Sequence, residues 1–198
     1  MNARPTEILA QEHQVILQVL ECLEKIAERA AAGSLDADGA RDVVEFFRGF
    51  ADRCHHGKEE VHLFPAMESK GYSADCGPTA VMRHEHELGR THIRGMDESI
   101  AAAAAGDSAA LERFVRNARA YLALLRQHID KEDHCLFPMA DQAFSETDQR
   151  VLLDLFHRVE REELGEGTHE RYVAIAERLA DRYGVAKTAP ANAGCCGH

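Results

Sequence analysis

An internal repeat constrains the fold of this 198-residue chain more than any other feature of its sequence. Residues 12–65 match residues 85–138 at a constant offset of 73 positions, and no gap is needed. The residues that recur are Glu12/Glu85, His13/His86, Gly33/Gly106, Arg53/Arg126, His55/His128, Lys58/Lys131, Glu59/Glu132 and Leu63-Phe64-Pro65/Leu136-Phe137-Pro138. Two copies of such a unit predict two similar helical hairpins packed about a pseudo-twofold axis.

Glycine, proline and capping residues indicate where the helices of the two hairpins begin and end. The expected helices cover approximately residues 5–32, 38–69, 78–105 and 108–143. Pro65 and Pro138 should kink or end the second and fourth of these helices. Short loops within each hairpin make its two helices antiparallel neighbours. The sequence therefore predicts an all-α fold, an up-down-up-down four-helix bundle over residues 1–144.

The remaining residues predict an additional C-terminal helical segment and a tail. Ser145 and Asp148 form a capping-box pattern at the start of an extension over residues 145–184, which we expect to pack on the bundle. Thr168 can cap a last helix that ends at Gly184. Residues 185–198 resemble a flexible tail that contains Cys195 and Cys196, which could bind a soft metal, act as a redox pair or have no role.

Composition argues against several classes of protein. A net charge of −11 argues against nucleic-acid binding, since phosphate recognition needs a basic surface. No apolar run approaches the roughly 18 residues that a membrane span needs, and the polar N-terminus does not resemble a signal peptide. The six cysteines follow no disulfide framework. Reduced thiols and a cytoplasmic location are therefore expected.

In all four predicted bundle helices, a repeated histidine interrupts the apolar stripe that should face the core. The stripe is least regular in residues 38–69. His13 lies 19 residues before the end of its helix and His55 lies 17 residues after the start of the next. At about 1.5 Å per residue these separations are roughly 28 and 26 Å, so the two side chains share one level. The same reasoning brings His86 and His128 to that level.

Two glutamates complete the set, because each lies four residues after a repeated histidine and therefore on the same helix face. Buried imidazoles and carboxylates are costly unless they are paired, hydrogen-bonded or bound to metal. Mutual hydrogen bonding is one solution, and a pair of metal ions bridged by the carboxylates is a better one. The expected metal ligands are His13, His55, Glu59, His86, His128 and Glu132.

The donor types favour iron over zinc, because structural zinc sites usually recruit cysteine. Manganese or a mixed pair is the alternative. Six further histidines do not recur in the repeat, and we interpret them as solvated residues or as neighbours that support the ligands: His56, His62, His84, His92, His134 and His157.

Four segments resemble the hemerythrin-like, HHE cation-binding family. They are Glu12-His13, CHHGKEEVHLFPAM (54–67), GPTAVMRHEHELGR (77–90) and QHIDKEDHCLFPMA (127–140). The resemblance implies two Fe ions in an oxo- or hydroxo-bridged di-iron centre, with Glu59 and Glu132 as bridges and the four repeated histidines as terminal ligands. Oxygen-carrying hemerythrins have a fifth histidine in an HxxxH pair on the third helix, whereas Met82 and Arg90 occupy the positions four residues from His86 here.

The missing ligand leaves open metal positions, which favour reaction or NO binding over reversible O₂ carriage. The leading hypothesis is a protein of oxidative or nitrosative stress defence that binds and reacts with NO, O₂ or H₂O₂. No pocket for an organic substrate is evident, and Tyr121 is a candidate hydrogen-bond donor near the centre.

The alternative is a non-enzymatic O₂ or redox sensor, or an iron store or donor with a redox or iron-acceptor partner protein. An additional ligand could come from the last helical region, although a polar rim is the simpler interpretation; the candidates are Glu163, Glu166, His169 and Tyr172.

Overall fold

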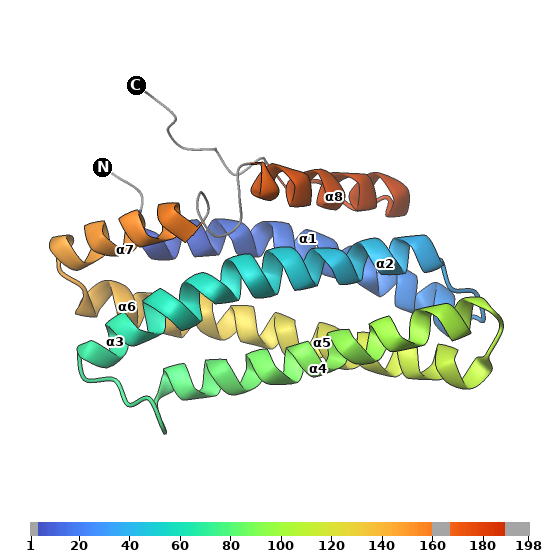
Figure 1. Cartoon of the computed structure of the whole chain (residues 1–198), viewed down its shortest axis with the longest axis horizontal. Coiled ribbons are helices and arrows are strands. Elements are labelled where there is room, and N and C mark those ends of the chain that lie inside the picture. The colour runs from blue at the N-terminus through green and yellow to red at the C-terminus, as the bar shows by residue number, and fades with distance from the viewer. Residues whose placement is uncertain (1–3, 160–166, 189–198) are drawn as a thin grey trace.

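The computed structural model of the chain describes residues 4–159 and 167–188, and in these it is an all-α bundle (Figure 1). The first helix of the bundle is α1 and the third is α4, whereas the second and fourth helices are each built from consecutive segments. The bounds are α1 Pro5–Ala31; α2 Ala37–Phe46, η1 Phe47–His56, η2 Glu59–Leu63 and α3 Phe64–Ser69; α4 Pro78–Ala104; and α5 Ser108–Lys131, η3 Glu132–Leu136 and α6 Phe137–Ala143.

The predicted four-helix bundle is confirmed, and the predicted helix ends agree with the structure to within one residue or so. Gly33 and Gly106 adopt φ of 96° and 95° just after α1 and α4, where a residue with a Cβ would be strained. Asp36 and Asp107 cap the helices that follow, because their side chains accept hydrogen bonds from the backbone N–H groups of Gly39 and Ala110. The two hairpins are therefore closed by equivalent turns.

The sequence allowed Pro65 and Pro138 either to kink or to end their helices. In the structure neither helix ends at its proline. Each proline is the second residue of an α-helix that directly follows a π-helical segment, η2 or η3. Proline cannot donate to the backbone ladder and its ring crowds the preceding turn, and a wider π turn accommodates both effects. The chain thus continues through the prolines with a change of helix type.

A ten-residue π-helical segment, η1, occurs only in the first repeat; the corresponding residues 120–129 lie in the regular helix α5. The wider turn of η1 explains why the apolar stripe of residues 38–69 follows the usual helical period poorly. Single-turn π segments often mark functional sites, and this one is longer and ends at the adjacent pair His55 and His56.

Two hydrophobic clusters fill the bundle on either side of the repeated histidines. The larger includes Phe47, Phe50 and Phe114, and the smaller includes Phe64, Phe137 and Phe156. The repeated histidines are therefore enclosed along the bundle axis by apolar side chains. Within the described ranges, no helix is long and apolar enough to span a membrane.

Two further helices, α7 Glu146–Arg158 and α8 Thr168–Tyr183, cover the bundle (Figure 1). The predicted capping box of Ser145 and Asp148 is present at the start of α7. Gly167, with φ of 82°, occupies the N-cap position of α8 that the sequence had suggested for Thr168. Tyr183 of α8 donates a hydrogen bond to Asp36 at 2.6 Å, which ties the extension to the first hairpin.

Candidate metal centre

The six predicted ligands are all buried, and the structure brings them together in the middle of the bundle. Their side chains come from α1, η1, η2, α4, α5 and η3, and none is more than 2% exposed. Two groups of donor atoms, each within 4.8 Å of one another, could hold a metal ion. The first donor group is His13, His55, Glu59 and Glu132, and the second donor group is His56, Glu59, His86 and His128.

Each of the four repeated histidines presents its Nδ1 atom to a carboxylate. The Nδ1–oxygen distances are 2.7 Å for His13–Asp133, 2.9 Å for His55–Glu12, 2.6 Å for His86–Glu60 and 2.9 Å for His128–Glu85. A carboxylate only accepts, so Nδ1 carries the proton and donates it. When such an imidazole is neutral, its Nε2 is left with a lone pair, the arrangement that carboxylate–histidine pairs give to metal ligands.

The Nε2 atoms face one another in pairs. Nε2 of His13 lies 3.0 Å from Nε2 of His55, and Nε2 of His86 lies 3.1 Å from Nε2 of His128. Two lone pairs at this distance repel unless a proton or a metal cation lies between them. Two nitrogen ligands about 2.1 Å from one ion and at a right angle to each other would be about 3.0 Å apart. The observed spacing therefore fits two imidazoles that share a metal ion.

Each glutamate points one carboxylate oxygen toward each group. Oε2 and Oε1 of Glu132 lie 3.2 Å from Nε2 of His13 and 3.1 Å from Nε2 of His128. Oε1 and Oε2 of Glu59 lie 3.6 Å from Nε2 of His55 and 3.5 Å from Nε2 of His86. None of these four buried oxygens accepts a hydrogen bond within the described structure. Such oxygens are costly to bury, and a pair of cations would satisfy them.

Protons occupy part of this site when no cation is present. Burial and the neighbouring Glu132 raise the pKa of Glu59. Burial alone would lower the pKa of His13 and His128, but contacts with Glu132 and with Asp133 or Glu85 raise both to about 9. Cations that bind here must displace these protons, as metal ions generally do when they bind histidine.

A shell of repeated residues supports the ligands. Glu12 holds His55 and accepts a hydrogen bond from Lys58 at 2.5 Å, and Glu85 holds His128 and pairs with Lys131 in the same way. The carboxylates on the other two histidines also correspond, because Glu60 and Asp133 differ by the repeat offset of 73. Sequence reasoning missed this last pair, although a search for recurring acidic rather than identical residues would have found it.

The repeated Leu-Phe-Pro motif has a direct role at the centre. The ring of Phe137 stacks on His13 with centroids 5.4 Å apart, and the ring of Phe64 stacks on His86 at 5.9 Å. The two prolines lie next in sequence, at the junctions between π and α segments. The motif therefore places one aromatic ring over an imidazole of each donor group.

His56 is the residue that the repeat analysis set aside and the structure brings into the centre. It is 5% exposed, which excludes the solvated side chain that was one of the two expected alternatives, and it belongs to the second donor group. Burial and the neighbouring His86 lower its pKa to about 3, which leaves the imidazole neutral. Its counterpart in the second repeat is Ile129, so a filter for identical residues could not find it. The signal was the HH doublet itself.

The other non-recurring histidines among residues 4–159 and 167–188 lie outside both donor groups. His84 and His134 are exposed, and His62, His92 and His157 are half-buried. In the last helix, His169 packs on Phe50 and Tyr172 fits against Gly49, and neither belongs to a donor group. Glu163, Glu166, Cys195 and Cys196 lie outside the described residues.

Cysteine contributes no donor in the described part of the chain. The four cysteines that the structure describes, Cys22, Cys54, Cys76 and Cys135, form no disulfide bond and lie outside both donor groups. The donors near the centre are therefore imidazole nitrogens and carboxylate oxygens, a set that suits iron or manganese and differs from the cysteine-rich sites of structural zinc.

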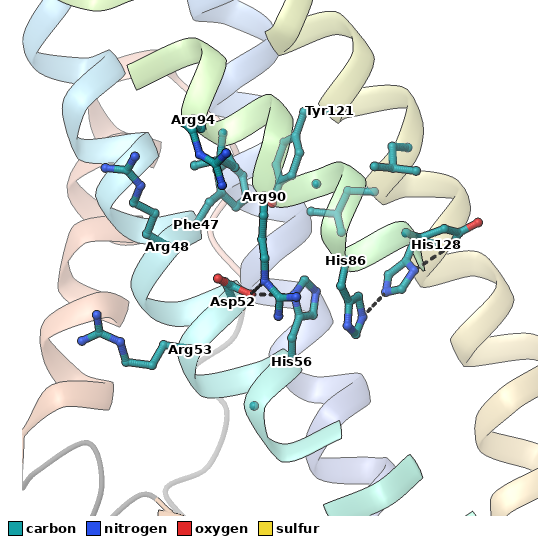
Figure 2. A pocket seen from close by; sticks show the side chains of 16 residues that line it. Phe47, Arg48, Asp52, Arg53, His56, His86, Arg90, Arg94, Tyr121 and His128 are labelled. Atoms are coloured by element: carbon teal, nitrogen blue, oxygen red, sulfur yellow. Dashed lines mark hydrogen bonds and ion pairs between the residues drawn. The ribbon is translucent and has the colours of Figure 1, made fainter. Parts of the chain in front are cut away.

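A cavity of about 500 Å³ opens onto the second donor group (Figure 2). His56, His86 and His128 line it, whereas His13 and His55 do not. Tyr121, the hydrogen-bond donor suggested by the sequence, is also in its wall and packs edge-on against Phe47 at 4.9 Å. The expectation that the chain has no evident pocket for an organic substrate is therefore wrong.

Comparison with known proteins agrees with the geometry. The model of the family described as "Hemerythrin HHE cation binding domain" matches residues 4–140. Proteins of Mycobacterium tuberculosis and Mycobacterium bovis, both described as uncharacterized, are each 27% identical over 176 residues, which is 88% of this chain and 67% of theirs. No solved structure matches the chain. The matched region contains all six predicted ligands and His56, and the chain belongs to the hemerythrin HHE cation-binding domain family.

Proposed function

We propose that this chain is a non-haem di-iron protein that binds and reacts with a small diatomic molecule or peroxide, namely NO, O₂ or H₂O₂, in oxidative or nitrosative stress defence. The observation that carries the proposal is the division of each buried glutamate between two groups of imidazoles, with one oxygen toward each group. This is the donor arrangement that two bridged metal ions require.

The proposed ligands are His13, His55, Glu59, His86, His128 and Glu132, and His56 is added on the side of the second donor group. When bound, a pair of irons supplies electrons and open positions for a small ligand. Glu12, Glu60, Glu85 and Asp133 orient the imidazoles by accepting their Nδ1–H groups.

The surroundings suit reactive small molecules. Phe64 and Phe137 cover two of the imidazoles and exclude water from that side of the centre. Tyr121 lines the cavity beside the second donor group, and burial raises the pKa of its hydroxyl, so it stays a proton-bearing donor at neutral pH. The described thiols are reduced, which is in keeping with a cytoplasmic location.

Two measurements test the proposal. Metal analysis with Mössbauer spectroscopy on freshly purified protein should give two irons per chain in a spin-coupled pair. Rapid mixing of the diferrous protein with O₂, NO and H₂O₂ should then produce turnover with release of a product. A stable, fully reversible adduct with all three would contradict the proposed reaction and indicate a sensor, and ready transfer of iron to an apo-acceptor would indicate a store or donor.

A further inference from the structure

The cavity beside the second donor group is a slot that extends along the bundle axis. Its walls come from η1, α4 and α5 (Figure 2). His56 and His86 lie at one end, and Arg48 and Arg94 lie eight residues away on the same two helical stretches. Eight residues of α-helix span about 12 Å, so the slot is about two helical turns long.

The volume of the slot exceeds what a diatomic molecule or a peroxide needs. One water molecule occupies about 30 Å³ of liquid, and NO, O₂ and H₂O₂ are of similar size. The cavity has a volume of about 500 Å³, which lies within the range of sites that hold small organic molecules. Phe47 and Ile93 give part of the wall an apolar surface suited to a hydrocarbon group.

The slot is also basic, although the chain as a whole carries a net charge of −11. Its wall includes four arginines, Arg48, Arg53, Arg90 and Arg94, against the two carboxylates of Asp52 and Glu85. Within residues 4–159 and 167–188, Arg90 pairs with Asp52, Glu60 and Glu87 and Arg48 pairs with Asp97, whereas Arg53 and Arg94 form no ion pair. Two guanidinium groups therefore remain available to an anion.

We propose that this slot binds a small organic carboxylate with an apolar chain. Its carboxylate pairs with Arg94, and its hydrocarbon part lies against Phe47 and Tyr121 and extends toward the imidazoles of the second donor group. Arg53 adds positive potential at the wall. The bound molecule would lie next to one donor group only, since the first donor group does not line the slot.

Isothermal titration of the full-length protein as purified, with hexanoate, hexanol, acetate and inorganic phosphate, tests the proposal. Hexanoate should bind with at least about tenfold higher affinity than the other three, because it alone offers both a charge and a chain. Arg94→Gln should weaken hexanoate binding about tenfold and leave hexanol unaffected, as expected for loss of one charge-assisted hydrogen bond. Arg119→Gln, an exposed arginine of α5 outside the slot, is the matched control and should change nothing.

A second variant tests whether the ligand needs the volume of the slot, whereas Arg94→Gln tests whether it needs the positive charge. Gly57 lines the slot, and a Cβ added there would meet no atom within 4 Å. Gly57→Leu should therefore fold, retain its metal and weaken hexanoate binding by filling the end of the slot next to His56. Unchanged hexanoate affinity in Gly57→Leu would overturn the proposal, as would equal affinity for acetate or phosphate and hexanoate.

Failure of this proposal is distinguishable from failure of the proposed function. The contacts with Arg94, Phe47 and Tyr121 need no metal, so hexanoate should also bind protein treated with a chelator whose circular dichroism is unchanged. A protein that reacts with NO or H₂O₂ yet binds no carboxylate would overturn only the slot proposal. One that binds hexanoate but holds no iron would overturn only the di-iron function.

Discussion

The imidazole of His56 lies flat against that of His86, with ring centroids 3.7 Å apart and planes inclined by 12°. No equivalent pair exists in the first donor group, because Ile129 occupies the corresponding position of the second repeat. The two halves of an otherwise symmetric centre therefore offer unequal numbers of imidazoles. The second donor group, which has three, is also the one that lines the cavity.

Replacement of His56 should weaken metal binding at one position only. We expect His56→Ala to lower the affinity for one of two irons by about 10- to 100-fold, the range found when a residue that supports a metal site is removed. Iron content after stepwise dialysis against a chelator measures this effect. His92→Ala, which removes a histidine that contacts Asn117 instead, should leave iron content unchanged. Equal retention of iron by the two variants would refute a ligand role for His56.

Replacement of either glutamate should disturb both metal positions. Glu59→Ala or Glu132→Ala should reduce iron below two per chain, because each carboxylate faces imidazoles of both donor groups. Inductively coupled plasma analysis together with Mössbauer spectra measures the content and the coupling. Glu24→Ala, which removes an exposed partner of Arg126, is the control. Unaltered stoichiometry in both glutamate variants would count against bridging.

The two repeated lysines should differ in their contribution to stability. Lys58 is fully buried with Glu12, whereas the side chain of Lys131 is 39% exposed. Lys58→Met leaves a buried carboxylate without its cation and should lower the free energy of unfolding by roughly 3 kcal/mol. Lys131→Met should cost less than about 1 kcal/mol, since solvent screens that pair. Urea denaturation of both variants at equal metal loading measures the difference, and similar losses would contradict the burial argument.

Acid should weaken the contact between α8 and Asp36, which lies in the turn between α1 and α2. Burial alone would raise the pKa of Asp36, but hydrogen bonds from Tyr183 and Gly39 and the charge of Arg182 outweigh burial and lower the pKa below 3.8. The ionised carboxylate therefore adds stability that is present above pH 3.8 and is lost as the pH falls through the lowered value.

Asp36→Asn keeps the side-chain oxygen but removes the charge, so its stability should vary less with pH in this window. The expected loss at pH 7 is about 1 kcal/mol, typical of one charge-assisted contact at a partly exposed site. Denaturation at pH 7 and at pH 3 checks both statements. Asp42→Asn, next to Arg178 on the same surface, is the control. A wild-type pH profile in Asp36→Asn would contradict the role given to this carboxylate.

The repeat predicted most of the fold and the six buried histidines and glutamates of the candidate metal centre. The gap-free offset located four helices, and the recurrence of His13 and His55 as His86 and His128 identified buried positions at one level. This worked because bundle geometry converts a sequence separation directly into a height along the axis. The positions of the two glutamates followed from the same helical period.

What sequence reasoning missed arises where the two repeats differ. The period of an α-helix describes α5 but not η1, whose wider turn directs both His55 and His56 into the core. A filter for identity removes any residue that has diverged between the repeats, and Ile129 in place of His56 is such a case. The cavity depends on how three helices pack side by side, which no pattern along one chain reports.

The carboxylate contacts on the four imidazoles have a consequence for how such a protein acquires its cofactor. Each ring is already oriented by a partner in the folded chain, and aromatic residues already cover two of them. These contacts fix the direction of each imidazole independently of an ion, so the ligand nitrogens need little reorientation when an ion binds. A site whose ligands are oriented in advance can bind any ion that accepts this geometry, so discrimination between iron and manganese would depend on the donor types and on which ion is available.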